Sequence, residues 1–114
     1  LFRGTVLRNA TLTGAGNGTG RNMGASTAGQ IFAVVFRLFS FTGTSITLTV
    51  EESQNDGGAD PYAAIAGVTS GALSAPGVVR DTTTAATEAW KRVVAAGTFS
   101  SAVVGVTAGI VAGS

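Results

Sequence analysis

The side chains that could perform acid–base chemistry are few and poorly placed for it. The chain of 114 residues contains six carboxylates and neither histidine nor cysteine. These two absent residues supply the most common general base and the usual thiol nucleophile. Glu51 and Glu52 are adjacent on an expected strand, so they point to opposite faces and cannot act as a pair. Serine and threonine hydroxyls are abundant, but Lys91 is the one lysine that could activate them. We therefore expect no enzyme, no catalytic residue and no bound cofactor.

One loop carries oxygen ligands that are close in sequence. Asp56 and Asp60 share the glycine-containing loop Ser53–Asp60, where Asn55 adds a further side-chain oxygen. Calcium prefers such ligands, but this spacing does not match an EF-hand loop with its closing glutamate. We expect ordinary turn residues and no metal, with a calcium site as the alternative. The glycines from Gly14 to Gly20 lack the Gly-Lys-Ser/Thr ending of a phosphate-binding loop.

Charges and aromatic side chains restrict the classes of partner. The net charge is +1, and the seven cations form no basic run, which argues against nucleic acid as a partner. Trp90 and Tyr62 are the two amphipathic aromatic residues. Single aromatic residues on strands usually fill a core, seal its edge or pack at an interface. A carbohydrate platform is the alternative, and it requires several coplanar exposed rings.

The clearest strand is Gln30–Phe41, which is apolar on both faces. Phe32, Val34, Phe36 and Leu38 share one face by the period of two. A strand of this kind is central and covered on both sides, or it uses its second face as an oligomer contact. Arg37 interrupts this second face and requires either a carboxylate or an exit to water. The second face carries Ile31, Ala33, Val35, Phe39 and Phe41.

Two turn signals predict two antiparallel hairpins. Ser45–Glu52 alternates between apolar and polar residues, and Thr42-Gly43-Thr44 separates it from Gln30–Phe41. This arrangement predicts a hairpin over 30–52. Ala89–Ala95 and Phe99–Thr107 flank Gly97-Thr98 and predict a second hairpin.

The remaining segments complete an all-β prediction. With no convincing helix, they indicate an antiparallel β-sandwich or barrel of about seven strands, as a single domain over 1–114. The uncharged tail Val93–Ser114 approaches the length of a membrane helix, but its glycines and β-branched residues favour strands. The chain starts at Leu1 without a visible secretory signal, which suggests a processed, trimmed or incomplete chain.

The other segments are expected to be short strands and loops. We expect an edge strand over Phe2–Leu12, a flexible loop or arm over Thr13–Gly29, short strands at Tyr62–Ile65, Val78–Arg80 and Ile110-Val111, a surface loop over Gly67–Pro76, and a loop over Asp81–Glu88 with one helical turn as the alternative.

Two segments together resemble a known group of proteins. They are Phe41–Gly67 (FTGTSITLTVEESQNDGGADPYAAIAG) and Trp90–Ile110 (WKRVVAAGTFSSAVVGVTAGI). The pattern resembles small β-sandwich virion proteins of tailed bacteriophages, in which a threonine-rich strand leads into a V-x-E-S-x-x-D/G loop. A later aromatic-x-R-V-V strand then passes through Gly-Thr into the closing strand. The matching positions are Val50, Glu52, Ser53, Asp56, Gly57, Trp90, Arg92, Val93, Val94, Gly97 and Thr98.

The resemblance implies a capsid decoration (cement) subunit that stabilises a shell by protein–protein contacts. A tail-tube or neck subunit and a carbohydrate- or receptor-binding adhesion domain are the alternatives. The implied partners are the major capsid protein or other virion subunits and further copies of the chain, with a trimer as the guessed oligomer. The implied location is the capsid surface, after assembly in the host cytoplasm, without nucleic acid or membrane as a partner. The expected interface residues are Ile31, Val35, Arg37, Phe39, Phe41 and Trp90.

Overall fold

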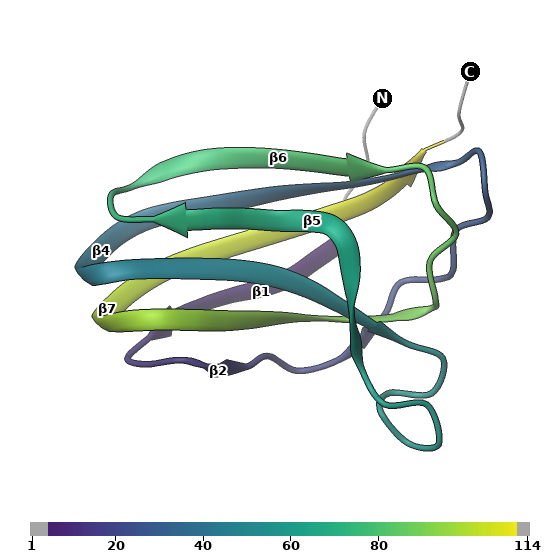
Figure 1. The fold of residues 1–114 in the computed structure, drawn as a ribbon, viewed down its shortest axis with the longest axis horizontal. Helices are drawn as coiled ribbons and strands as arrows, with labels where there is room; N and C mark the ends of the chain where they lie inside the picture. Colours follow the sequence, from purple (N-terminus) through teal and green to yellow (C-terminus); the bar gives the residue numbers. More distant parts are fainter. Residues whose placement is uncertain (1–4, 112–114) are drawn as a thin grey trace.

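A computed structural model describes residues 5–111, which form an antiparallel all-β domain (Figure 1). Two long strands, β4 and β7, pair with each other along their whole length, from Ile31 opposite Val111 to Ser53 opposite Trp90. The other strands add to the two sides of this ribbon. The strands are β1 (Thr5–Leu12), β2 (Gly16–Asn17), β3 (Arg21–Asn22), β4 (Ile31–Ser53), β5 (Ala63–Leu73), β6 (Gly77–Thr83) and β7 (Trp90–Val111).

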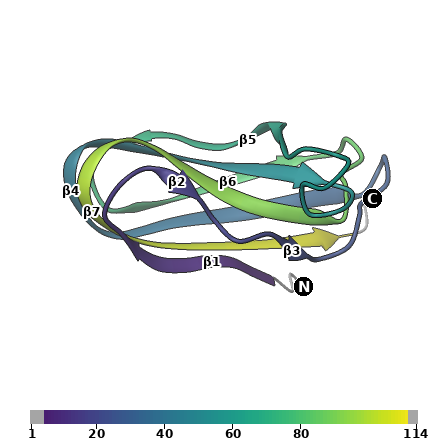
Figure 2. The same ribbon diagram turned by 90° about the horizontal axis from the view of Figure 1, so that it is seen from below.

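The long ribbon folds back on itself and thereby produces a two-layer sandwich (Figure 2). Layer one contains β1, the second half of β7, the first half of β4 and β6. Layer two contains β2 and β3, the first half of β7, the second half of β4 and β5. The shortest dimension of the molecule is 19 Å, as expected for two sheets packed about 10 Å apart with side chains on their outer faces. We call the end of the sandwich where the β4–β7 ladder begins and finishes, at Ile31–Val111 and Ser53–Trp90, the open end.

Glycines at the two bends let the ribbon fold without losing its pairing. Gly97 has a φ of +116°, and an added Cβ there would clash with the backbone oxygen of Ser45. An added Cβ at Gly43 would clash with Phe99 on the neighbouring strand. The pairing register also shifts on both sides of Gly43. Both strands therefore turn the corner together, and each bend requires a residue without a side chain.

The core lies between the layers and follows the strand period of two. Inward residues of the two long strands alternate with outward residues along each half. Burying a large apolar side chain of this kind contributes about 1.5–3 kcal/mol. The fully buried apolar side chains include Phe32, Val34, Phe36, Ile46, Leu48, Val50, Val68, Val93, Val104 and Val106.

Charged side chains link the two layers along both sides of the sandwich. On one side Arg8 of β1 donates from Nη1 to the carbonyl oxygen of Val93 in layer two, at 3.2 Å. The Gly18 N–H donates to the same oxygen at 2.7 Å, and burial lowers the pKa of Arg8. On the other side Asp81 of β6 accepts the backbone N–H of Thr69 in β5 at 3.1 Å. Each contact joins a strand of one layer to a segment of the other layer with which it does not pair, so it fixes the spacing of the layers.

The all-β antiparallel class is confirmed, but both predicted hairpins are wrong. The two halves of Gln30–Glu52 do not pair with each other, and neither do the two halves of Ala89–Thr107. Instead, the first segment pairs with the second throughout. Thr42-Gly43-Thr44 and Gly97-Thr98 are corners of continuous strands. A Gly-Thr signal is compatible with a reversal and with a bend, and here pairing to the neighbouring strand favours the bend.

Several segment boundaries also differ from the sequence-based expectation. The predicted loop Gly67–Pro76 continues β5 as far as Leu73, and β6 is longer than Val78–Arg80. Asp81–Glu88 contains no helical turn, since its first residues complete β6 and Thr87 forms a bridge with Ser26. The Thr13–Gly29 segment carries β2 and β3 and runs along the edge of β7. Residues 5–111 contain no helix long and apolar enough to span a bilayer, and β7 occupies most of the tail considered for one. Residues 2–4 of the predicted first strand lie outside the described residues.

Candidate docking surface

The predicted interface residues divide between two sides of the sandwich. Ile31, Val35, Arg37 and Phe39 point away from the core on layer one. Phe41 does not join them, because Phe39 is an extra residue between Leu38 and Ser40 in the register with β7. This bulge reverses the alternation and turns Phe41 towards the core, where its ring centroid lies 6.2 Å from that of Phe99.

Trp90 belongs to the other layer. It follows the outward period of β7, next to the buried Lys91, and pairs with Ser53 and Asn22. The predicted interface residues therefore do not form one site. Four of them lie on layer one, Phe41 faces the core, and Trp90 lies on layer two.

The outward side chains of layer one form ordered rows across its strands. Directly paired residues share a face, so the ladder itself gives the rows. One row runs Val6–Thr107–Val35–Arg80. We call this surface of layer one the outer face.

A second row contains a glycine, which makes the outer face lower at that point. It runs Asn9–Gly105–Arg37–Val78 across the same strands. Gly105 leaves room for the Phe39 ring, whose Cε2 atom would lie 3.0 Å from a Cβ at that position.

The outer face carries the exposed large hydrophobic residues of the described chain. Val6, Phe39 and Val78 are 50%, 57% and 56% exposed, and they come from three different strands. Sequence reasoning found Phe39 but missed Val6 and Val78, because their strands β1 and β6 are short and irregular in pattern. Clustered exposed apolar residues are typical of an interaction site.

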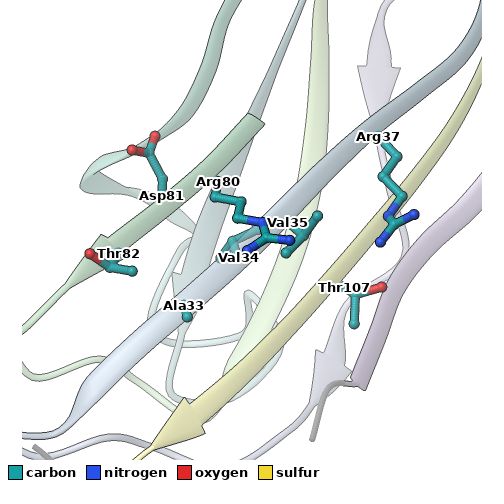
Figure 3. A pocket seen from close by; sticks show the side chains of 8 residues that line it. All are labelled: Ala33, Val34, Val35, Arg37, Arg80, Asp81, Thr82 and Thr107. Carbon is teal, nitrogen blue, oxygen red and sulfur yellow. The ribbon is translucent and has the colours of Figure 1, made fainter. Parts of the chain in front are cut away.

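Two arginines flank a depression in the outer face (Figure 3). The depression has a volume of about 500 Å³, and the Arg37 and Arg80 side chains extend over it from β4 and β6. A smaller hollow of about 140 Å³ adjoins Arg37 and Phe39. The larger depression is lined by Ala33, Val34, Val35, Arg37, Arg80, Asp81, Thr82 and Thr107.

The two arginines of the outer face have no acidic partner among residues 5–111. The one ion pair in this part of the chain joins Arg92 to Glu51. Asp81 lines the depression, but its carboxylate accepts the Thr69 N–H of the other layer. The outer face therefore presents two arginines that form no ion pair within residues 5–111, beside apolar side chains.

The opposite surface of the sandwich carries the one ion pair found within residues 5–111. Arg92 of layer two contacts Glu51 at 2.6 Å, and its guanidinium lies 4.3 Å from the centroid of the Tyr62 ring. The Tyr62 hydroxyl donates to Asp56 at 2.7 Å. Burial, followed by this hydrogen bond, raises the pKa of Tyr62 to about 12. Tyr62 already has a partner for its ring and its hydroxyl, so it is a poor stacking platform for a sugar.

The carboxylates gather at the open end. Glu52 accepts the backbone N–H of Glu88 at 2.8 Å. The interaction between the side chains of Asp60 and Glu88 raises the pKa of Glu88 and lowers that of Asp60. Within residues 5–111, no three acidic side chains are arranged to hold a metal ion. The residues here are Glu51, Glu52, Asp56, Asp60 and Glu88, five of the six carboxylates in the sequence.

Lys91 is a buried cation beneath the open end, and sequence reasoning gave it no structural role. Its Nζ donates to the backbone oxygens of Gly24, at 2.9 Å, and Glu88, and lies 5.0 Å from the Phe32 ring centroid. Burial lowers the pKa of Lys91 to about 8, although Glu52 and Glu88 oppose the shift. The alternation of β7 contained the signal, because Lys91 shares the parity of Val93.

Comparison with protein-family models, with curated proteins and with solved structures gives no match for this chain.

Proposed function

We propose that this chain is a structural subunit of a bacteriophage virion, a capsid decoration protein that binds through the outer face. The observation that carries the proposal is the difference in exposed apolar side chains and in charge pairing between the outer face and the opposite surface of the sandwich. The outer face collects Val6, Phe39 and Val78 with two arginines that form no ion pair within residues 5–111, whereas the opposite surface pairs Arg92 with Glu51. A sandwich with one such surface is suited to lie against a protein neighbour.

The resemblance to small phage virion proteins supports the setting. Its two segments, Phe41–Gly67 and Trp90–Ile110, cover the second half of β4, the start of β5 and most of β7, and they pair with each other in the sheet. A decoration subunit occupies many identical sites, so that modest affinity at each site is multiplied by avidity. The proposed partners are the major capsid protein and further copies of the chain, at the capsid surface. In this role the chain acts by contact and not by catalysis.

The proposal is tested on virions produced with and without the protein. We expect the chain in purified particles at a fixed ratio to the major capsid protein, and a lower rupture temperature in particles without it. Adding purified protein is expected to restore the rupture temperature, because the bound subunits bridge their neighbours.

A matched pair of variants assigns the effect to one surface. Val78→Asp places a charge on the outer face and is expected to prevent the restoration. Ala72→Asp places the same charge on the outward side of β5, since Ala72 is exposed and pairs with Thr47, and is expected to restore fully. Absence of the chain from particles, or equal loss with both variants, contradicts the proposal.

A further inference from the structure

The charge on the outer face determines which neighbour it can accept. Two copies packed outer face to outer face would bring Arg37 and Arg80 of each copy against the same residues of the other. Like charges in a partly desolvated contact are unfavourable and suppress that arrangement. Asp81 lines the same depression, but its carboxylate accepts the Thr69 N–H and forms no ion pair with either arginine within residues 5–111, so the net charge here stays positive. The face therefore requires an acidic neighbour.

This same chain carries an acidic surface at its open end. Five carboxylates lie there, against Arg21, Lys91 and Arg92, of which Lys91 is buried and Arg92 is paired with Glu51. The loop between β4 and β5 projects beyond the sheet (Figure 1). Asp56 is exposed on this loop. Glu88 lies near the same loop, because its side chain interacts with Asp60.

We propose that the outer face of one copy receives the acidic open end of a second copy, with the loop that carries Asp56 seated at the depression between Arg37 and Arg80. The inference rests on the docking role proposed above for the outer face and names its occupant. Each copy uses two different surfaces, so the contact is heterologous and continues from copy to copy until a ring closes.

The size of the face sets the strength of a single contact. Four strands spaced about 4.8 Å apart and about seven residues long present roughly 450 Å² in projection. A standard interface takes about 800 Å² from each partner. One contact is therefore weak, depends on concentration and gains its stability from ring closure.

Sedimentation velocity of the purified chain over an approximately hundredfold concentration range tests the proposal. We expect reversible association that weakens as NaCl rises from about 0.05 M to about 0.5 M, because salt screens the charges. Arg37→Glu with Arg80→Glu is expected to raise the dissociation constant by about tenfold or more. Asp56→Lys with Glu88→Lys is expected to do the same from the other side.

Mixing the two reversed variants gives the decisive result. Each is expected to stay monomeric alone, whereas the mixture assembles, because an acidic outer face then meets a basic open end. Arg21→Glu is the matched control. It changes the charge at the open end by two units, as each lysine substitution does, but in the opposite direction, and it is expected to strengthen association. Asp56→Asn, which suits the φ of +57° at this position, replaces the lysine variant if that variant does not fold, and it should weaken association.

Three results would overturn the inference: a wild-type chain that stays monomeric, association insensitive to salt and to both reversals, or failure of two folded reversed variants to assemble on mixing. Its failure is distinguishable from failure of the proposed function. A monomeric chain that still binds virions and raises their rupture temperature refutes the inference alone. Association by the charge-reversal rule in a chain absent from virions refutes the proposed function alone.

Discussion

Gly97→Ala is expected to destabilise the fold by about 4 kcal/mol, a large share of the roughly 5–15 kcal/mol available to a domain. The φ of +116° at this bend strains a residue with a side chain, at a cost of about 1–3 kcal/mol. The added Cβ also clashes with the Ser45 backbone oxygen, which cannot yield without moving β4. Overpacking adds about 1–3 kcal/mol. Denaturant unfolding followed by circular dichroism measures the difference.

Gly77→Ala is the control for this substitution. Gly77 begins β6 in open space, without a positive φ, so alanine there is expected to change stability by less than about 1 kcal/mol. If Gly97→Ala proves as stable as Gly77→Ala, the ribbon does not bend at Gly97 as described.

The free energy of unfolding is expected to rise by about 2 kcal/mol between pH 8 and pH 10. Burial lowers the pKa of Lys91 to about 8 in the fold, against 10.5 for a solvated lysine side chain. Over this window the unfolded chain retains a proton that the folded chain has released, so stability increases with pH. Below pH 8 both states hold the proton, and the full cost of the buried charge remains.

Lys91→Met separates this effect from other titrations. It removes the titrating amine at similar volume, and its stability is expected to be flat over the same window. Tyr62, with a folded pKa raised to about 12, opposes the trend only above about pH 10, where the unfolded tyrosine ionises. A wild-type stability that is flat or falls between pH 8 and pH 10 would contradict the burial of a charged Lys91.

The sequence pattern predicts which face each core side chain occupies, but not which strands pair. Phe32, Val34, Phe36 and Leu38 are buried together, as their spacing indicates. Strand pairing depends on whether a glycine corner reverses the chain or only bends it. That choice depends on the partner strand: β4 and β7 together form a longer ladder than two separate hairpins would. Local residues alone do not contain this information.

The candidate surface was predicted in part for the same reason. Ile31, Val35, Arg37 and Phe39 follow from the alternation of one strand. Val6 and Val78 join them only through pairing across β7 and β4, which no local pattern reveals. Phe41 leaves the surface because of a one-residue bulge, and such a bulge has no clear signature in the sequence.

Site-specific photo-cross-linking tests most directly whether the outer face is the docking surface. The photoreactive residue p-benzoylphenylalanine is introduced in place of Val78 in one preparation and in place of Ala72 in another, and each is irradiated in assembled virions. We predict efficient cross-links to a neighbouring subunit from position 78 and none above background from position 72. Cross-links from position 72 with none from position 78 would contradict the account.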